Sequence, residues 1–592
     1  MTPMHEFNTV NLADFGLIAL YFVILIWVGA YAARKNTSTD EYFKGGGKIP
    51  WLVAGVSNWV SGYSAFMFVA AAGFTYTNGI GTALIFTSAT WAYLVGYAVF
   101  ARRWARARLH SPLEFLTRRY SPSTTYYYSF TAIIPQIVGI GQGLYILCIF
   151  VSTALGFSER EFVVAGFSMS GLQLSIVSVG IVMVVYTVIG GLWAAVLSDA
   201  VQSVIIMTMT VIIFPVAFQH LGGDEGFLGG FRRLIAEAPE GYLGLSGDTA
   251  NPLFLLAYLI NVMLGYNVAW PLVQRYHSVP GEQDARKMAL LCAGLSIIGP
   301  LLWILPVMAS RILFPNINEL WPSLAVPAEA SFVSLALLLL PHGMMGFVVS
   351  AILSATLGQA NDAFNWLAAT LTRDVYVPVH RRLAGAAPSE RSQLLVARTT
   401  MLTVGILGTG VALYIPKLGG AFSFALQYYS LTAAFMMPVA LGMLYTRTPW
   451  WSGIASCTAA VTVGLGLMLA GVWEEQAFVR NMFSESIAAA AVFFLSALWY
   501  REDDPRSASI RKLEQDLATP LVGDSRRVDA GSLHVYRLLG KVCLVLGCVL
   551  SASVVLPPTG IASPFINVVA GILLLSLAAL LYAVSREPSR GS

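Results

Sequence analysis

Two apolar segments of the sequence are interrupted at their centres by small and polar residues. The first, residues 54–64, reads AGVSNWVSGYS, and the second, residues 261–271, reads NVMLGYNVAWP. An interrupted helix exposes main-chain carbonyl and amide groups that can bind an ion or a polar solute in the middle of a membrane. Glycine, serine and asparagine also let helices pack closely, but two such segments at corresponding places favour a binding site.

We expect polar and aromatic side chains on these segments and on neighbouring spans to line one solute cavity. A polar solute needs a few directed hydrogen bonds between aromatic walls. The candidate solute-binding residues are Asn58, Tyr63, Ser88, Tyr266, Asn267 and Gln427.

Two carboxylates also lie within apolar stretches. A charge at membrane depth is costly unless it binds an ion or changes protonation. Asp199 can cap the helix that it begins, together with Ser198, or it can serve an ion site. Asp362 lies too far inside the segment 347–371 to be an ordinary cap. We therefore expect Asp362 to handle ions or protons.

The composition excludes a water-soluble fold. The chain has 592 residues, of which 57% are apolar and 11% are charged, whereas soluble domains carry about 25% charged residues. A bilayer can solvate such a surface, and about 20 apolar residues are enough for one helix to cross it. The formal net charge of +4 comes from basic loops between apolar runs, a pattern that indicates membrane topology and not nucleic-acid binding.

The apolar runs predict an all-α polytopic membrane protein with about 14 to 15 transmembrane helices. Basic residues concentrate in the loops after odd-numbered spans. We expect the chain to lie in the plasma or inner membrane of the cell. The positive-inside rule then predicts that the amino terminus faces outside and the carboxyl terminus faces the cytoplasm.

The two interrupted segments open two groups of five spans, and an odd number of spans gives the groups opposite orientations, as an inverted repeat requires. We therefore divide the chain into five parts along the sequence. They are an outer terminus with the first helix and its loop (1–49), a ten-helix transport core (50–447), accessory helices (448–500), a flexible cytoplasmic linker (501–535), and carboxyl-terminal helices with a tail (536–592).

Four motifs resemble those of the sodium:solute symporter family, in order and in spacing. They are DEYFKGGG at 40–47, YTVIGGLWAAVLSDAVQ at 186–202, QRY at 274–276 and TRDVY at 372–376. The resemblance extends from about Asp14 to Arg447 and rests on hydropathy beyond that point.

The resemblance implies a fold of the leucine-transporter type, in which ten core helices form two inverted repeats with two broken helices. It also implies a secondary active transporter that imports a small polar organic solute with sodium by alternating access. The expected partners are then the solute, the sodium ion and membrane lipid.

In the family, sodium lies between the broken second span and the ninth span. Carried over by motif, the ligands on the second span are the carbonyl groups of Ser57 and Val60. On the ninth span, counting back from TRDVY gives Ala355, Gly358 and Gln359. Carbonyl oxygens suit a hard cation.

The ninth span departs from the family pattern, because relatives have a pair of hydroxyl residues where this chain has Gly358 and Gln359. Three alternatives remain open. The Gln359 amide oxygen can replace a hydroxyl, a shift of one helical turn offers Ser354 and Thr356, or protons replace sodium through Asp362. An uncoupled carrier is a fourth possibility.

Gln427 falls where sugar-carrying relatives have a solute-binding glutamine, and Tyr266 falls where they have an aromatic gate. Their acidic and lysine contacts correspond to Ile85 and Ser296 here, so the residues do not single out a sugar. A solute sensor that signals through the 501–535 segment is the rival interpretation. An enzyme is disfavoured, because no constellation of nucleophile, base and acid or of metal ligands is visible.

Overall fold

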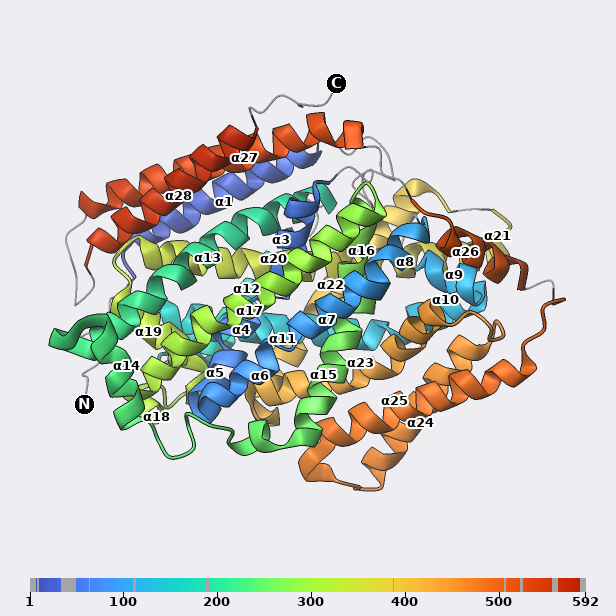
Figure 1. Ribbon diagram of the computed structural model, residues 1–592, viewed down its shortest axis with the longest axis horizontal. Coiled ribbons are helices and arrows are strands. Elements are labelled where there is room, and N and C mark those ends of the chain that lie inside the picture. Colours follow the sequence, from blue (N-terminus) through green and yellow to red (C-terminus); the bar gives the residue numbers. More distant parts are fainter. Residues whose placement is uncertain are drawn as a thin grey trace.

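The structure is a computed structural model, and it describes residues 7, 10–33, 49–62, 64–109, 113–164, 166–186, 192–386, 388–504, 507–521, 525–555 and 563–585. Within these ranges the chain is almost entirely helical (Figure 1). The strands found there, β1 (Glu161–Val164) and β2 (Phe167–Ser170), form an antiparallel hairpin with Glu161 opposite Ser170.

The first group of core helices contains several short pieces, because small residues and turns divide its spans. Its members are α3 (Trp51–Ser61), α4 (Ala65–Phe68), α5 (Ala70–Asn78), α6 (Thr82–Phe86), α7 (Ala89–Val95), α8 (Ala101–Arg106), α9 (Glu114–Arg119), α10 (Pro122–Thr131), α11 (Ile133–Ala154), α12 (Gly171–Tyr186) and α13 (Leu192–Gly222).

The second group follows a short connecting helix, α14 (Gly226–Glu237). Its members are α15 (Pro252–Val268), α16 (Trp270–Ser278), α17 (Glu282–Leu313), α18 (Ile317–Leu320), η8 (Pro327–Ala330), α19 (Ser331–Leu339), α20 (Met344–Ala369), α21 (Val377–Ala384), α22 (Glu390–Tyr414) and α23 (Gly420–Leu444). Outside the two groups lie α1 (Leu12–Ala33), α24 (Ser452–Leu469), α25 (Ala477–Ser496), α26 (Ala508–Ala518), α27 (Ser525–Ala552) and α28 (Phe565–Val584).

Ten helical stretches among the described residues are long and apolar enough to cross a membrane, or eleven if the two arms of α23 count as one bent span. This result confirms the all-α polytopic membrane fold. The sequence prediction of about 15 spans counts more, because it counts α5 and α7 in separate spans, whereas both lie within the one candidate stretch 65–106, which a turn at Gly79 (φ 66°) divides. It also counts shorter apolar helices such as Gly171–Val184 and Met344–Ala360.

Each of the two groups begins with an interrupted helix. The first is broken between α3 and α4, and the second is broken between α15 and α16. The groups interleave, because α3 packs against α17 while α15 packs against α7 and α23. This arrangement is consistent with the expected inverted repeat.

Glycines allow the core helices to approach each other closely. A Cβ atom added at Gly299 of α17 would lie 2.3 Å from Cζ2 of Trp59 on α3. A Cβ atom added at Gly141 of α11 would lie 2.7 Å from the carbonyl oxygen of Gly408 on α22. Such contacts between backbones are the usual means of helix association where lipid gives no hydrophobic driving force.

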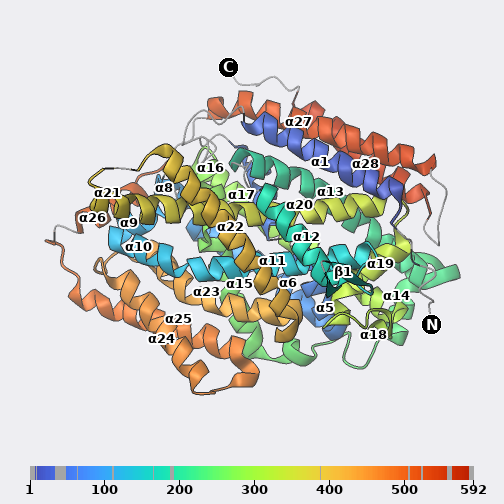
Figure 2. The same cartoon turned by 180° about the vertical axis from the view of Figure 1, so that it is seen from behind.

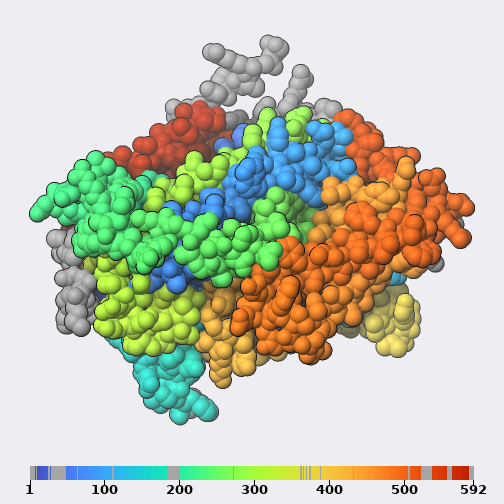
Figure 3. All heavy atoms as spheres, turned by 60° about the horizontal axis from the view of Figure 1, so that its bottom comes forward, coloured from blue at the N-terminus to red at the C-terminus, as the bar shows by residue number. Residues whose placement is uncertain are grey.

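The helices run between two ends of the molecule. In Figure 1, α14, α18 and α19 lie at one end, and α8, α9, α21 and α26 lie at the other. Figure 2 shows β1 at the same end as α14 and α19, and Figure 3 shows the teal part of the chain, which contains the hairpin, projecting from the body.

The segment 501–535, for which the sequence predicts a flexible linker, contains the docked helix α26. Ile510 and Leu513 on this helix are fully buried. Asp516 pairs with Arg108 at 3.1 Å and with Arg118 at 3.3 Å. The apolar residues are few, but their spacing of three places them on one face of a helix, and that face packs against α8 and α9.

Candidate functional site

The first interruption lies at residues 62–64, between the end of α3 at Ser61 and the start of α4 at Ala65. Ser64 begins α4 by accepting a hydrogen bond from the Phe66 amide at 3.4 Å. A Cβ atom added at Gly62 would lie 2.5 Å from the hydroxyl oxygen of Tyr266. Glycine at position 62 therefore allows the two interrupted helices to approach each other.

The second interruption lies at Ala269, whose backbone is extended (φ −64°, ψ 129°) between α15 and α16. Asn267 holds this break to the first group. Its Nδ2 atom donates to the carbonyl oxygen of Ala92 at 3.0 Å, and its own carbonyl accepts from Trp104 Nε1 at 2.8 Å. The polar groups freed by the break are thus partly paired with neighbouring helices, as burial in lipid requires.

A cavity of about 230 Å³ lies beside the first interruption. Its walls come from the start of α4, from α11, from α20 and from α23. Its polar lining side chains are Ser64, Gln136, Gln142, Thr356, Gln359, Tyr428 and Tyr429. Among the described residues that line it, none is charged. Its size suits a solute smaller than a drug molecule, for which pockets begin near about 300 Å³.

Small residues on α11 shape the cavity. A Cβ atom at Gly139 would lie 2.8 Å from the Tyr428 hydroxyl oxygen, so this hydroxyl reaches the backbone of α11. A Cβ atom at Gly143 would lie 3.6 Å from Cγ2 of Thr356, an ordinary contact distance. Gln142 is 5% exposed, and its side chain makes no hydrogen bond with the residues that the structure describes. Its amide is therefore available to a solute.

Gln359 connects the cavity to the first interruption, because its Nε2 atom donates a hydrogen bond to the carbonyl oxygen of Ser61. The predicted sodium ligands lie around this contact. The Ser57 carbonyl accepts from the Ser61 hydroxyl at 2.8 Å. The carbonyl oxygen of Val60 faces the amide of Gly62 at the end of α3.

The other predicted ligands, Ala355 and Gly358, lie on α20. Ala355 is 4% exposed, and a Cβ atom added at Gly358 would meet no atom within 4 Å. Among the described residues, none occupies the space beside α20 at Gly358.

Both hydroxyls of the one-turn alternative have other partners. Ser354 accepts a hydrogen bond from Gln202 Nε2 of α13 at 2.7 Å, and Thr356 donates to the carbonyl of Ile352 at 3.1 Å. Asp199 lies on α13 and Asp362 on α20, but both side chains lie outside the part of the chain that the structure describes.

The predicted solute residues that the structure describes do not line this cavity. Tyr63 lies outside the described residues. Asn58 is fully buried and approaches Cys292 of α17, while the Ser88 hydroxyl donates to the carbonyl of Ile85.

Tyr266 and Gln427, which the sequence also predicts to bind the solute, are not among the lining residues of the cavity either. The Tyr266 ring lies 4.8 Å from the ring of Tyr93. Gln427 is exposed, and its neighbours Tyr428 and Tyr429 line the cavity in its place.

Sequence reasoning missed Gln136 and Gln142 on α11. Both are amides inside an apolar run, where a polar side chain is costly unless it has a function. This signal was available in the sequence of residues 133–154.

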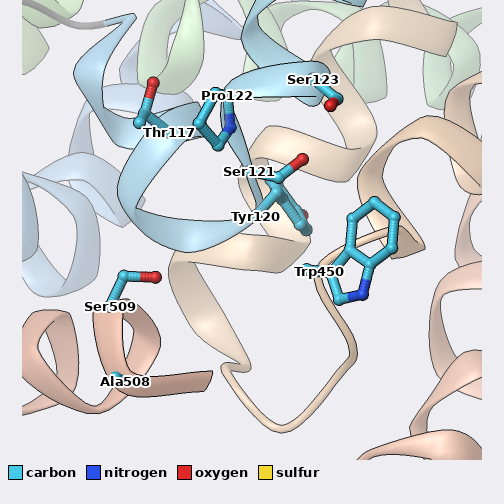
Figure 4. A pocket seen from close by; sticks show the side chains of 8 residues that line it. All are labelled: Thr117, Tyr120, Ser121, Pro122, Ser123, Trp450, Ala508 and Ser509. Carbon is cyan, nitrogen blue, oxygen red and sulfur yellow. The ribbon is translucent and has the colours of Figure 1, made fainter. Parts of the chain in front are cut away.

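A larger hollow of about 510 Å³ lies away from both interruptions, among Thr117, Ser121, Trp450 and Ser509. Figure 4 shows that its lining comes from the turn between α9 and α10, from the loop at Trp450 and from the start of α26. It does not touch α3, α4, α15 or α16. We therefore take the smaller cavity as the candidate site.

Comparisons with known proteins agree with one another. The model of the family described as "Sodium:solute symporter family" matches residues 42–451. The sodium/glucose cotransporter of Vibrio parahaemolyticus is 24% identical over 525 residues, which span 84% of this chain and 92% of that protein. The sodium/sialic acid symporter NanT of Aliivibrio fischeri is 22% identical over 426 residues, which span 69% of this chain and 77% of that protein.

Among solved structures, the substrate-bound outward-open state of a Na+-coupled sialic acid symporter is similar to this chain with a TM-score of 0.65. The match covers 83% of this chain and 98% of that one, at 18% sequence identity. At this identity the likeness shows the fold alone.

Proposed function

Since the chain belongs to the sodium:solute symporter family, whose model covers residues 42–451, we propose that it carries a small uncharged polar solute into the cell together with sodium. As a member of this family it is a multi-pass, sodium-coupled membrane transporter and not an enzyme. Two interrupted helices that meet inside the membrane support alternating access, because a site between them can open first to one side and then to the other.

The proposal about the solute rests on the described residues that line the 230 Å³ cavity, none of which is charged. Amide and hydroxyl groups at Gln136, Gln142 and Tyr428 can donate to and accept from hydroxyl groups, and the rings of Phe66 and Tyr429 supply apolar walls. A carboxylate solute would lose its hydration without gaining a cationic partner, at a large cost. A neutral polyhydroxylated solute, like the sugar named for the Vibrio parahaemolyticus relative, is therefore favoured over an anion such as sialic acid.

We place the sodium ion between the end of α3 and the middle of α20. Its ligands would be the carbonyl oxygens of Ser57, Val60 and Ala355, together with the Gln359 amide. Gln359 Nε2 now donates to the Ser61 carbonyl, and a half-turn of the amide would present Oε1 to the ion instead. Oxygen ligands alone suit sodium, as they suit other hard cations.

The distribution of basic residues supports an outer amino terminus. Arg103, Arg106 and Arg108 follow one span, and Arg381 and Arg382 lie on α21. These elements gather at the end of the molecule that holds α26 (Figure 1). By the positive-inside rule this end is cytoplasmic, and the opposite end, with α14 and α19, faces outside.

A competition experiment tests the charge of the solute. Reconstituted protein is given a labelled neutral sugar under an inward sodium gradient, with unlabelled neutral sugars, sugar acids and sialic acid as competitors. We expect neutral compounds to compete and acids of similar size to fail. Competition by the acids alone would refute the proposal, and binding without any accumulation would identify a sensor.

A further inference from the structure

Glu329 is a buried carboxylate outside the cavity, on η8. Its side chain joins a loop to the start of α23, because its Oε1 atom accepts hydrogen bonds from the amides of Ala421 at 2.6 Å and Phe422 at 3.3 Å. Amides in the first turn of a helix have no partner within the helix, and a negative charge there is favoured by the helix dipole. Glu329 is 2% exposed.

The polar contacts of Glu329 are directed to α23 alone. Its second oxygen, Oε2, makes no hydrogen bond with any residue that the structure describes. Its main chain packs directly on α5, because a Cβ atom added at Gly73 would lie 3.0 Å from the Glu329 Cα and amide nitrogen atoms. Glu329 thus connects α23 to the first interrupted span.

An aromatic stack leads from Glu329 to the cavity. The ring of Phe422 lies 4.1 Å from the ring of Phe74 on α5, at an interplanar angle of 18°. It also stacks on Phe66 at 6.2 Å and 28°. Phe66 lines the cavity, and it meets the ring of Tyr429, another lining residue, at 6.1 Å. These ring contacts connect the lining of the cavity to the residue beside Ala421, which Glu329 holds.

The part of α23 that carries Phe422 can move as a unit. Two glycines in the left-handed region precede it, Gly419 with φ 90° and Gly420 with φ 89°. The helix then bends by 44° between its arms 420–430 and 432–444. Glycine at positive φ and a bend in the helix are both features of hinges, so the outer arm 420–430 has a hinge at each end.

The side of the membrane follows from the neighbours of η8. This element packs against α5, α18 and α19, and α18 and α19 lie at the end of the molecule opposite α21 and α26 (Figure 1). That end faces outside in the proposed orientation.

We propose that Glu329 is a positioning residue that holds the outer arm of α23 over the cavity, and that loss of its hydrogen bonds opens the cavity to the outside. The inference rests on the proposed function, since it takes the 230 Å³ cavity as the solute site and uses the membrane orientation proposed above.

The experiment measures access to the cavity and needs no solute. Ala360, a small lining residue on α20, is replaced by cysteine as a reporter. Cys548, the exposed cysteine of α27, is replaced by serine. A membrane-impermeant thiol reagent is then added to right-side-out vesicles and to inverted vesicles, and the rate of modification at position 360 is followed.

In right-side-out vesicles, Glu329→Ala is expected to raise the modification rate by about tenfold or more, the ratio that corresponds to a hydrogen bond with a charged group. Glu329→Asp, whose carboxylate is one methylene shorter, should give a smaller rise. The matched control is Glu319→Ala, because Glu319 is exposed on the neighbouring α18. It should leave the rate unchanged.

Equal rates for all four proteins, or a rise confined to inverted vesicles, would overturn the proposal. If Glu329→Ala does not reach the membrane, Glu329→Gln decides the matter, because it keeps an acceptor oxygen but lacks the charge.

Uptake gives a second readout. A larger outward-open population should lower the sodium concentration for half-maximal uptake and also lower the maximal rate. A purely structural defect would lower the maximal rate alone. If Glu329→Ala raises the modification rate at position 360 but the protein takes up no sugar, the role proposed for Glu329 stands and the proposed solute is refuted.

Discussion

Position 358 offers a direct test of the proposed sodium site, because a ligand that relatives supply is missing there. Gly358 lies on α20, one residue before Gln359, whose amide bonds to the Ser61 carbonyl. An added Cβ atom would meet no atom within 4 Å. A serine at position 358 therefore has room among the described residues, and the proposed site requires its hydroxyl oxygen to reach the ion near the interruption between α3 and α4.

The size of the effect follows from the energy of one contact between a neutral oxygen and a charge. Such a contact contributes about 1.5 to 3 kcal/mol, and about 1.4 kcal/mol corresponds to a factor of ten in affinity. Gly358→Ser should therefore lower the sodium concentration for half-maximal uptake by about tenfold. Folding should not suffer, because serine is favoured over glycine inside a helix by about 0.5 kcal/mol.

The assay is the sodium dependence of uptake into proteoliposomes for the native protein, Gly358→Ser and Gly358→Ala. Alanine fills the same space without an oxygen, so it should leave the sodium dependence close to native. An identical shift in both variants would assign the effect to a stiffer helix. If Gly358→Ser leaves the sodium dependence of uptake unchanged, sodium does not bind next to position 358 of α20, and the reasoning is refuted.

Three further predictions concern the break, the cavity and the cytoplasmic end. Gly62→Ala places a Cβ atom 2.5 Å from the Tyr266 hydroxyl oxygen, so it should lower the free energy of unfolding by about 1 to 3 kcal/mol. Thermal unfolding in detergent measures this loss, and the control is Gly265→Ala, whose Cβ atom meets no atom of the described residues within 4 Å. Gly143→Leu should fill the cavity and abolish solute uptake. Gly143→Ala should retain uptake, because its Cβ atom would lie at an ordinary 3.6 Å from Cγ2 of Thr356. Equal uptake by both variants would exclude this cavity as the solute site. Asp516→Ala removes the pairs with Arg108 and Arg118 and should speed tryptic cleavage at Arg511 and Lys512, while the exposed Asp503→Ala should not.

The interruptions of the two helices could be predicted from the sequence, because their causes are local. Glycine is unfavourable inside a helix, and proline lacks an amide to continue a preceding helix but suits the first turn of a new one, which is where Pro271 lies in α16. The structure breaks at these residues. The membrane fold could be predicted for a similar reason, since hydropathy depends on composition within a window and not on distant contacts.

The residues that line the cavity could not be predicted in the same way. Which face of a helix meets the cavity depends on how distant helices pack, and Asn267 is instead paired with α7 and α8. The neighbours of Gln427 line the cavity, because one residue along a helix turns the side chain by about 100°. The docking of α26 likewise depends on Arg108, in the loop after α8, and on Arg118 of α9, which its own sequence does not reveal.

The central claim is that an inward sodium gradient drives a neutral polyhydroxylated solute through this protein. The most direct measurement is the steady-state accumulation of a labelled neutral sugar in proteoliposomes, with and without that gradient and after its collapse by a sodium ionophore. We expect the sugar inside to exceed the sugar outside only while the gradient lasts. Accumulation that ignores sodium, or equilibration to the same level under all three conditions, would contradict the account.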